Sequence, residues 1–391
     1  MIFGPGAVHG VLAFTIDGIA LFSIAFSLLT ALRAPGVIKK RKFESKVYPP
    51  VTILKPLKGA ETGLFENLNS FCTMDYPEFQ IILTVASPDD SATPIAEKIK
   101  TKFPDLDIQI VFSGDNPPLG LNPKINNVSA AQPFIKHEFL MITDSDVRVR
   151  KDFLKQMVEP LLNPQIGLVT SFYQGAQSQK FWPAMEALSI NAYFLPQAMT
   201  AYAYGMRFAM GAAMLIRRDV FENIGGFPYL AQYLADDFVL GEAVKSAGLD
   251  IAASRSLVEC VTEDSGFLKY LKHQVRWAHT IYSCQPLGYF GLLFLHGFSL
   301  LLLSTALLGV NSTAFFFMTA ALLAKFLAQR RILSAAGMKS NWRSFFLLPA
   351  SELIIFFAWI LGWRTQPVSW RGETYSFSGR IEEPVLAAAE R

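Results

Sequence analysis

The sequence contains few cysteines and few charged residues. Cys72, Cys260 and Cys284 are the three cysteines among 391 residues. Their number is odd and no short spacing joins them, so neither a disulfide framework nor a cysteine-based zinc site is indicated, and a reducing compartment is favoured. Charged residues make up 17% of the chain, below the roughly 25% that is usual in soluble domains. The formal net charge of +3 is small, which argues against a nucleic-acid partner.

Apolar residues are abundant instead. The hydrophobic fraction is 51%, the aromatic fraction is 13% and the mean hydropathy is +0.30. This composition predicts an integral membrane protein. The length also accommodates one catalytic domain of about 200 to 250 residues beside the membrane segments.

The N-terminal part, residues 1–33, is predicted to be a transmembrane helix. Its apolar run covers 7–32, long enough to cross the hydrocarbon core of a bilayer. The run has neither a charged n-region before it nor a small-residue cleavage site, so we expect it to be retained rather than removed as a signal peptide. The linker 34–47 is cationic and predicts a cytoplasmic flank by the positive-inside rule. The cations are Arg33, Lys39, Lys40, Arg41, Lys42 and Lys46.

Three further apolar runs predict transmembrane helices within residues 286–364, ahead of a C-terminal tail at 365–391. The runs cover about 287–310, 313–328 and 345–363.

Charged residues interrupt these runs. Lys325, Arg330 and Arg331 are expected to end the second run, and they favour the cytoplasmic side. Glu352 lies inside the third run, where a carboxylate either lines the path of an acceptor or pairs with another helix.

The segment 48–285 has the pattern of a water-facing α/β domain. Amphipathic stretches at 64–71 and 92–102 predict helices that connect apolar strands, which favours a mostly parallel, Rossmann-like mixed sheet with helices on both faces. The segment 181–216 is rich in aromatic residues and interrupted by prolines, and predicts either interfacial helices against the bilayer or a buried helical core. The expected strands are 51–54, 80–85, 108–112 and 139–143.

Two carboxylates follow the last of these strands. Asp144 and Asp146 come directly after 139–143, at the carboxyl end of a strand, where open α/β sheets bind ligands. Such a pair can hold a hard cation, Mg²⁺ or Mn²⁺, which neutralises a diphosphate. The alternative is a solvated turn in which Asp146 caps the next helix.

Other candidate residues lie in loops. Asp236 and Asp237 precede a helical pattern, so one of them either caps that helix or acts as general base for a hydroxyl. Asp90 follows a strand and by itself is typical of a turn. Lys124 lies in a loop of turn and amide residues, 120–127, that either cradles phosphates or is an ordinary helix cap.

The segment before the membrane runs contains His273, Arg276 and Trp277. The arginine fork can clamp phosphate and the indole can pack on a sugar or on an acceptor. By themselves these residues are equally typical of a membrane interface.

Taken together these motifs resemble a known family. Asp90, Asp144, Asp237 and His273-x-x-Arg276-Trp277 resemble in order and spacing the D, D, D, (Q/R)XXRW series of processive-type GT-A glycosyltransferases. The likeness is closer to the ceramide glucosyltransferases, glycosyltransferase family 21, and it covers nearly the whole chain. The stretches that carry this closer likeness are 54–59, 122–127, 144–149 and 368–371.

This resemblance implies a GT-A fold and an inverting enzyme that moves a sugar from a UDP-sugar, typically UDP-glucose, onto the hydroxyl of a membrane lipid on the cytoplasmic leaflet. Asp237 is the implied catalytic base, and Asp144 and Asp146 are the implied metal ligands. Asp236 and His273 are expected on the acceptor or diphosphate side. The residues expected to bind the donor are Lys55, Asp90, Asn122, Lys124, Asn126, Asp144, Arg276 and Trp277.

Two positions depart from the family pattern. His273 replaces the Gln or Arg that opens the (Q/R)XXRW motif, so its contact can depend on pH. Asp146 stands where the eukaryotic ceramide enzymes have glycine, and it completes a fuller metal-binding pair.

Several readings of the function stay open at this point. Bacterial hopanoid-modifying glycosyltransferases are similar over 276–281, so a hopanoid acceptor with UDP-GlcNAc is an alternative to ceramide. A polysaccharide synthase would need more membrane spans, and a non-catalytic scaffold would need the carboxylates to be caps only. The expected location is a bacterial inner membrane with the catalytic domain in the cytoplasm. The sequence does not identify the sugar or the oligomeric state.

Overall fold

The computed structural model describes two compact units, and each is considered by itself. The sheet unit comprises Val37–Ala176 and Ala201–Glu263, and the helix unit comprises Met1–Gly36, Gln177–Thr200 and Asp264–Arg391. Within these bounds the structure describes residues 5–38, 47–114, 116–263, 266–309, 312–338, 340–363, 368–370, 373–377 and 384–386. The cations of the predicted linker other than Arg33, namely Lys39, Lys40, Arg41, Lys42 and Lys46, lie outside the described residues, as does Arg371.

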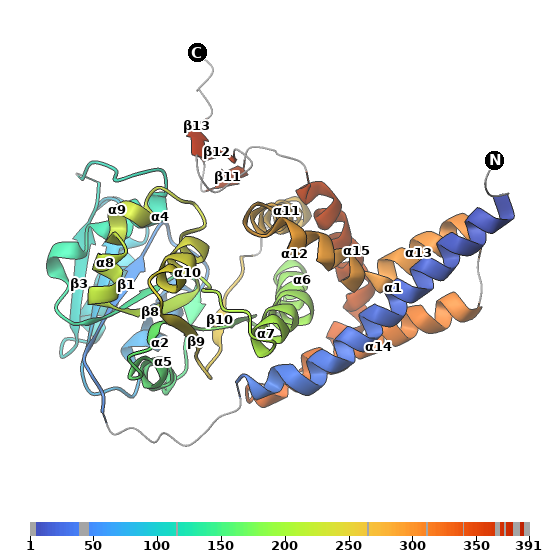
Figure 1. The fold of residues 1–391 in the computed structure, drawn as a ribbon. Coiled ribbons are helices and arrows are strands. Elements are labelled where there is room, and N and C mark those ends of the chain that lie inside the picture. The colour runs from blue at the N-terminus through green and yellow to red at the C-terminus, as the bar shows by residue number, and fades with distance from the viewer. Residues whose placement is uncertain are drawn as a thin grey trace, which may run out of the picture. The chain divides into compact units, whose positions relative to one another are not determined.

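A seven-stranded mixed sheet is the framework of the sheet unit (Figure 1), with the strand order β3-β2-β1-β4-β8-β6-β9. Strand β1 pairs in parallel with β2 and β4, and β2 pairs in parallel with β3. Strand β8 is antiparallel to both β4 and β6, whereas β9 is parallel to β6. The strands are β1 Val51–Pro56, β2 Phe79–Val85, β3 Asp107–Phe112, β4 Phe139–Thr143, β6 Ile166–Thr170, β8 Ala213–Arg217 and β9 Asp250–Ala253.

Strands β1 and β2 are buried along their whole length. Every residue of β1 and β2 is buried, as expected for strands covered on both faces. Ile53 packs in one core cluster with Leu68 of α2, Ile99 of α3 and Met157 of α5, while Leu54, which points to the opposite face, is also completely buried. The helices of this unit are α2 Leu64–Cys72, α3 Thr93–Lys102, α4 Pro123–Ser129, α5 Phe153–Leu161, α8 Arg218–Asn223, α9 Gly226–Leu230 and α10 Asp236–Ser246.

The predicted α/β class with a mixed sheet is therefore confirmed.

A short 3-10 turn, η2, covers Gln132–Phe134. Three short strands form a second sheet in the order β5-β10-β7. They are β5 Val147–Arg148, β7 Tyr173–Gly175 and β10 Val258–Cys260.

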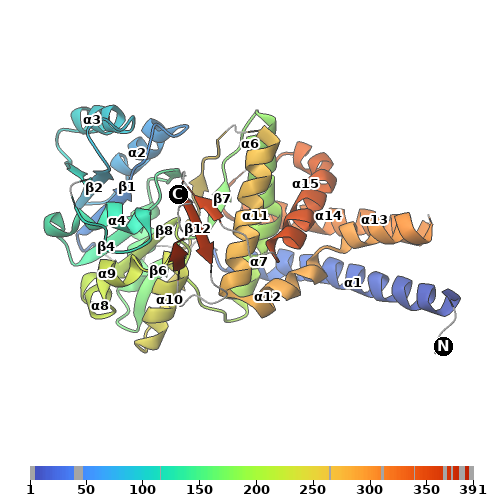
Figure 2. The same cartoon turned by 90° about the horizontal axis from the view of Figure 1, so that it is seen from above.

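The helix unit is a bundle of long apolar helices. Within it α6 and α11 lie side by side (Figure 2), and α6 and α11 both contact α15. The C-terminal strands β11 Val368–Trp370, β12 Glu373–Phe377 and β13 Pro384–Leu386 pair in that order. The helices are α1 Pro5–Arg33, η1 Ala34–Gly36, α6 Phe181–Ser189, η3 Ile190–Phe194, α7 Leu195–Ala203, α11 Gly266–Cys284, α12 Pro286–Gly291, η4 Leu292–Leu295, α13 Gly297–Leu308, α14 Ser312–Ala335 and α15 Arg343–Gly362.

Three helices in the described part of the chain are long and apolar enough to cross a membrane. They cover Gly10–Gly36, Ser312–Ala335 and Arg343–Gly362.

The helical prediction for the end of 181–216 is wrong. Residues 181–203 are helical, but Ala213–Arg217 is strand β8 in the middle of the large sheet. Residues 213–216 form a continuous buried apolar run, and such a run cannot be assigned to helix or strand from periodicity alone. The two units also divide the predicted domain 48–285, because 177–200 and 264–285 belong to the helix unit.

The predicted span at 287–310 is not one straight helix. Two helical segments, Pro286–Leu295 and Gly297–Leu307, meet at an angle of 63°. The backbone carbonyl that is freed at the break, on Leu295, accepts hydrogen bonds from Lys325 Nζ at 2.7 Å and Ser23 Oγ at 3.1 Å. A Cβ at Gly297 would lie 2.9 Å from the Cβ of Ser23, so the glycine allows α1 to pack closely against the break.

Helix α14 does not end at its charged residues, as the sequence suggested, but continues through Lys325, Arg330 and Arg331 to Ala335. Lys325 can remain inside the bundle because Glu352 of α15 accepts a hydrogen bond from its ammonium group. The other carboxylate oxygen of Glu352 lies 3.3 Å from Nδ1 of His296. Glu352 is completely buried, so of the two predicted roles the structure favours pairing with another helix.

The buried pair of Lys325 and Glu352 can be tested by comparing the stability of single variants with that of the double variant. Glu352→Gln and Lys325→Met should each destabilise the protein by about 3 to 5 kcal/mol, because either change leaves a buried charge without its partner. The double variant should regain most of the loss, since no orphaned charge remains between these two positions. Thermal unfolding of the detergent-solubilised chain measures the effect. A double variant whose loss equals the sum of the two single losses would contradict the pairing.

Candidate active site

One lysine lies at the centre of the candidate site in the sheet unit. Lys124, in the first turn of α4, places Nζ 2.8 Å from Asp144 Oδ1 at the end of β4. The same Nζ lies 3.2 Å from Asp236 Oδ2 at the start of α10, without the geometry of a hydrogen bond. Burial by itself lowers the pKa of Lys124, but the carboxylates of Asp144 and Asp236 outweigh burial and hold that pKa well above its usual range. The Lys124 ammonium group therefore lies between two carboxylates that favour its charged form.

The backbone of Asp144 is held by Lys55. Lys55 Nζ donates to the carbonyl oxygen of Asp144 at 2.6 Å and lies 3.8 Å from the centre of the Phe71 ring. Burial lowers the pKa of Lys55 to about 7, against the opposing effect of Asp144 and Asp146. Lys55 is completely buried, so this geometry favours a positioning role over the predicted contact with the donor.

Asn122 and Asn126 also bond to the backbone around them. Asn122 Oδ1 accepts from the backbone N–H of Lys124 at 2.9 Å, which caps α4, and its amide donates to the carbonyl of Tyr233 at 2.8 Å. Asn126 Oδ1 accepts from Leu119 and Gly120 backbone N–H groups, and its amide donates to the Gly120 carbonyl. These side chains shape the loop that presents Lys124, and the geometry favours this role over direct donor binding.

Asp90 joins two strand-end loops. Its Oδ1 accepts from the backbone N–H of Gly59, after β1, and from that of Ala92, before α3, both at 2.8 Å. Asp90 is only partly buried. It therefore combines a structural contact with access to a ligand, as the predicted nucleotide contact requires.

Asp236 and Asp237 are the first two residues of α10, and the N-cap position is occupied by Ala235, which makes no side-chain cap. The N-cap alternative for the aspartates is therefore wrong. Asp237 Oδ2 accepts from the backbone N–H of Gly211, and Oδ1 accepts from that of Phe238, both at 2.8 Å. A Cβ at Gly211 would lie 3.3 Å from Asp237 Oδ2, so glycine allows this close approach.

The surroundings of Asp237 suit a proton acceptor. Burial, reinforced by the neighbouring Asp236 carboxylate, raises the pKa of Asp237 to about 6. The two backbone hydrogen bonds fix the carboxylate, while each oxygen retains a further lone pair. A carboxylate with a pKa near the working pH is an effective general base.

Asp144 and Asp146 are two carboxylates that could hold a divalent cation only if it takes most of its ligands from elsewhere. Among the described residues, no group of three or more His, Cys, Asp or Glu side chains gathers to form an all-protein cage. Mg²⁺ is usually held by one or two carboxylates together with phosphates and waters. The Asp144 side chain is 38% exposed, so it can meet a diphosphate from solvent.

Sequence reasoning missed Glu61 and Gly211. Glu61 Oε2 accepts a 2.5 Å hydrogen bond from Oγ of Ser145, the residue that separates the two candidate metal ligands in the sequence. Neither residue belongs to a recognisable motif, although Glu61 follows the family-like stretch 54–59 by two positions.

His273, Arg276 and Trp277 lie on α11, in the helix unit. His273 Nδ1 is hydrogen-bonded to Glu186 of α6, which is only 5% exposed and was not singled out by sequence reasoning. The His273 ring centroid lies 4.9 Å from that of Trp277, which lies 5.6 Å from that of Phe194. Glu186 therefore holds the His273 ring, which packs against Trp277.

Comparison with known proteins identifies one family model and several relatives that match this chain. The sequence model described as glycosyl transferase family 21 matches residues 14–380. Ceramide glucosyltransferases 1 and 3 of Caenorhabditis elegans are 26% and 28% identical to this chain over 53% and 54% of its length. The matched part spans 44% and 46% of those relatives, a little under half of their length.

One solved structure that matches this chain is the mannosyltransferase PcManGT from Pyrobaculum calidifontis, in complex with GDP-Man and Mn²⁺. It is 19% identical, with a TM-score of 0.49, and the match covers 91% of this chain and 96% of that one.

Proposed function

Because the chain belongs to glycosyl transferase family 21, we propose that it is a GT-A-type enzyme that moves a hexose from a UDP-sugar, glucose from UDP-glucose, onto the hydroxyl of a membrane lipid. Ceramide is the proposed acceptor. The observation that carries the proposal is the meeting of Asp144, Lys124 and the Asp236–Asp237 pair at the edge of the sheet. A cation beside two carboxylates, next to a partly exposed proton acceptor, suits the transfer of a group that leaves as a diphosphate.

In the proposed reaction, Asp237 takes the proton of the lipid hydroxyl as its oxygen bonds to the anomeric carbon. The bond from that carbon to the diphosphate oxygen breaks, UDP leaves, and the configuration of the sugar inverts. Lys124 lies where it can compensate the charge on the departing diphosphate. A divalent cation on Asp144 and Asp146 would supply further charge neutralisation.

Asp90 is assigned to the nucleotide, and Arg276 and Trp277 to the diphosphate and acceptor end. Lys55, Asn122 and Asn126 hold the loops that carry Asp144 and Lys124. The direct contact to the donor on this side is therefore assigned to Lys124.

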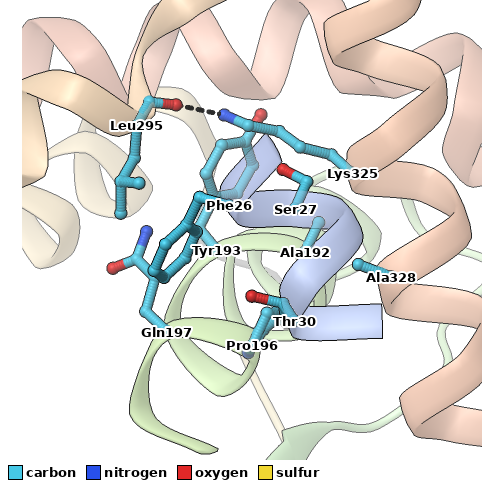
Figure 3. Close-up of a pocket in the computed structure, with 10 residues that line it drawn as sticks. All are labelled: Phe26, Ser27, Thr30, Ala192, Tyr193, Pro196, Gln197, Leu295, Lys325 and Ala328. Carbon is cyan, nitrogen blue, oxygen red and sulfur yellow. Dashed lines mark hydrogen bonds between the residues drawn. The ribbon is translucent and has the colours of Figure 1, made fainter. Parts of the chain in front are cut away.

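We assign the sheet unit to the cytoplasm, with a bacterial inner membrane as the proposed location. Thr30 near the end of α1 and Ala328 in α14 line the same small pocket (Figure 3), so these parts of the two helices lie together. Arg33 and the pair Arg330 and Arg331 follow these positions by two or three residues. Cations gathered at one end of a bundle favour the cytoplasmic side.

Lipid analysis tests the acceptor and the sugar together. Cells with the gene should contain a hexosylated sphingolipid that cells without it lack, and mass spectrometry of extracted lipids identifies both parts. A hexosamine-bearing hopanoid in its place would assign the alternative acceptor. Identical glycolipids in the two strains would reject lipid glycosylation.

A further inference from the structure

Lys124 occupies one oxygen of the Asp144 carboxylate, to which we assign the metal. Lys124 Nζ lies 2.8 Å from Asp144 Oδ1, and the lysine side chain is 11% exposed. A divalent cation on that oxygen would be placed within a few ångströms of the lysine ammonium group, and like charges at such a distance repel strongly in a partly buried site. A cation on that oxygen would therefore disfavour Lys124 at its present position.

The Lys124 ammonium group has an alternative carboxylate partner. Oδ2 of its second carboxylate, Asp236, is 3.2 Å away and has no hydrogen-bond partner in the described part of the chain. The backbone of Lys124 is held by Asn122, so the movement needs only the flexible side chain, with its four-carbon stem. A bound diphosphate would offer the same ammonium group a third anionic partner.

We propose that Lys124 is a built-in counter-ion that occupies Asp144 in the donor-free enzyme and is transferred to the diphosphate when donor and metal arrive together. The inference rests on the proposed function, because it assumes that Asp144 meets a nucleotide diphosphate. It gives the site an order of events: a divalent cation alone binds weakly because Lys124 opposes it, and the nucleotide relieves that opposition. Metal and nucleotide thus bind cooperatively through one side chain.

The proposal predicts effects of opposite sign in a single variant. In the detergent-purified full chain, Lys124→Gln should bind Mn²⁺ alone about tenfold more tightly, as measured by electron paramagnetic resonance, because the competing cation is gone. The same variant should bind UDP at saturating Mn²⁺ about tenfold more weakly, because the diphosphate loses its lysine. Lys136→Gln is the matched control, since Lys136 pairs with Asp107 in an exposed salt bridge of 2.6 Å, and it should change neither affinity.

A second variant keeps the test decisive if Lys124→Gln does not fold. Asp236→Asn removes the alternative carboxylate and should hold Lys124 more firmly on Asp144, so Mn²⁺ alone should bind more weakly than to wild type. If Lys124→Gln weakens Mn²⁺ and UDP binding alike, or changes neither, the counter-ion role is wrong. The sugar-transfer assay is separate: if Lys124→Gln shows the opposite-sign pattern but the wild type makes no glycolipid, the proposed function is rejected and this inference stands.

Discussion

Asp237→Asn should lower sugar transfer to lipid by about 10²- to 10⁴-fold, the usual contribution of a positioned proton acceptor. Asparagine has nearly the same size, and its carbonyl oxygen can accept one of the bonds from Gly211 and Phe238. The fold and the binding of nucleotide and metal should therefore survive, since those are assigned to Asp90, Asp144 and Lys124. Initial rates of glycolipid formation report on the chemical step, and UDP binding measured in parallel shows whether the donor site is intact.

The neighbouring residue Asp236 provides the comparison variant, Asp236→Asn. Asp236 faces Lys124, whereas Asp237 is held by backbone N–H groups. Turnover of Asp237→Asn within about threefold of wild type would remove it from the chemistry. A selective chemical defect in Asp236→Asn, with Asp237→Asn losing nucleotide binding instead, would reverse the two assignments.

The same assignment sets the pH dependence of transfer. Burial and Asp236 raise the pKa of Asp237 to about 6, and a base acts only when it is deprotonated. The value of kcat/KM should therefore be half-maximal at about pH 6, reach a plateau about one unit higher, and fall about tenfold per pH unit well below pH 6. A profile measured at saturating Mn²⁺ that stays flat down to pH 4.5 would show that another group takes the proton.

Removal of the divalent cation should also lower the rate of sugar transfer strongly. Transfer should require Mg²⁺ or Mn²⁺, and Asp144→Asn should lower it by about 10²- to 10³-fold, as expected when charge stabilisation of a leaving group is lost. Asp146→Asn should cost less, because Asp144 also contacts Lys124. Asp107→Asn, which alters an exposed carboxylate paired with Lys136, is the matched control. Full activity of both site variants in the presence of chelator would contradict a metal role.

The sequence predicted the strands of the sheet well where burial is continuous. The predicted 139–143 coincides with β4, and 80–85 lies within β2, because both runs are short and flanked by polar or turn residues, and that length suits a strand better than a helix. Residues 213–216 have the same character, but they follow an aromatic helical stretch, so their membership of β8 depended on a pairing with β4 that only the tertiary structure reveals.

Polar residues were harder to assign because a motif does not tell which atoms are already paired. The stretch 122–127 marks the right loop, but Asn122 and Asn126 bond to backbone groups, and only Lys124 reaches the carboxylates. In the helix unit, Lys325 suggested the end of a span. Its partner Glu352 is 27 positions away, and no local pattern connects them.

The most direct test of the central claim is release of UDP from UDP-glucose by the purified chain in detergent. We predict release that requires both Mn²⁺ and added ceramide, with glucosylated ceramide formed in equal amount and with Asp237→Asn inactive under the same conditions. UDP release that is the same without lipid, or ceramide that stays unmodified while wild type and Asp237→Asn consume donor alike, would contradict a lipid glycosyltransferase that uses Asp237 as its base.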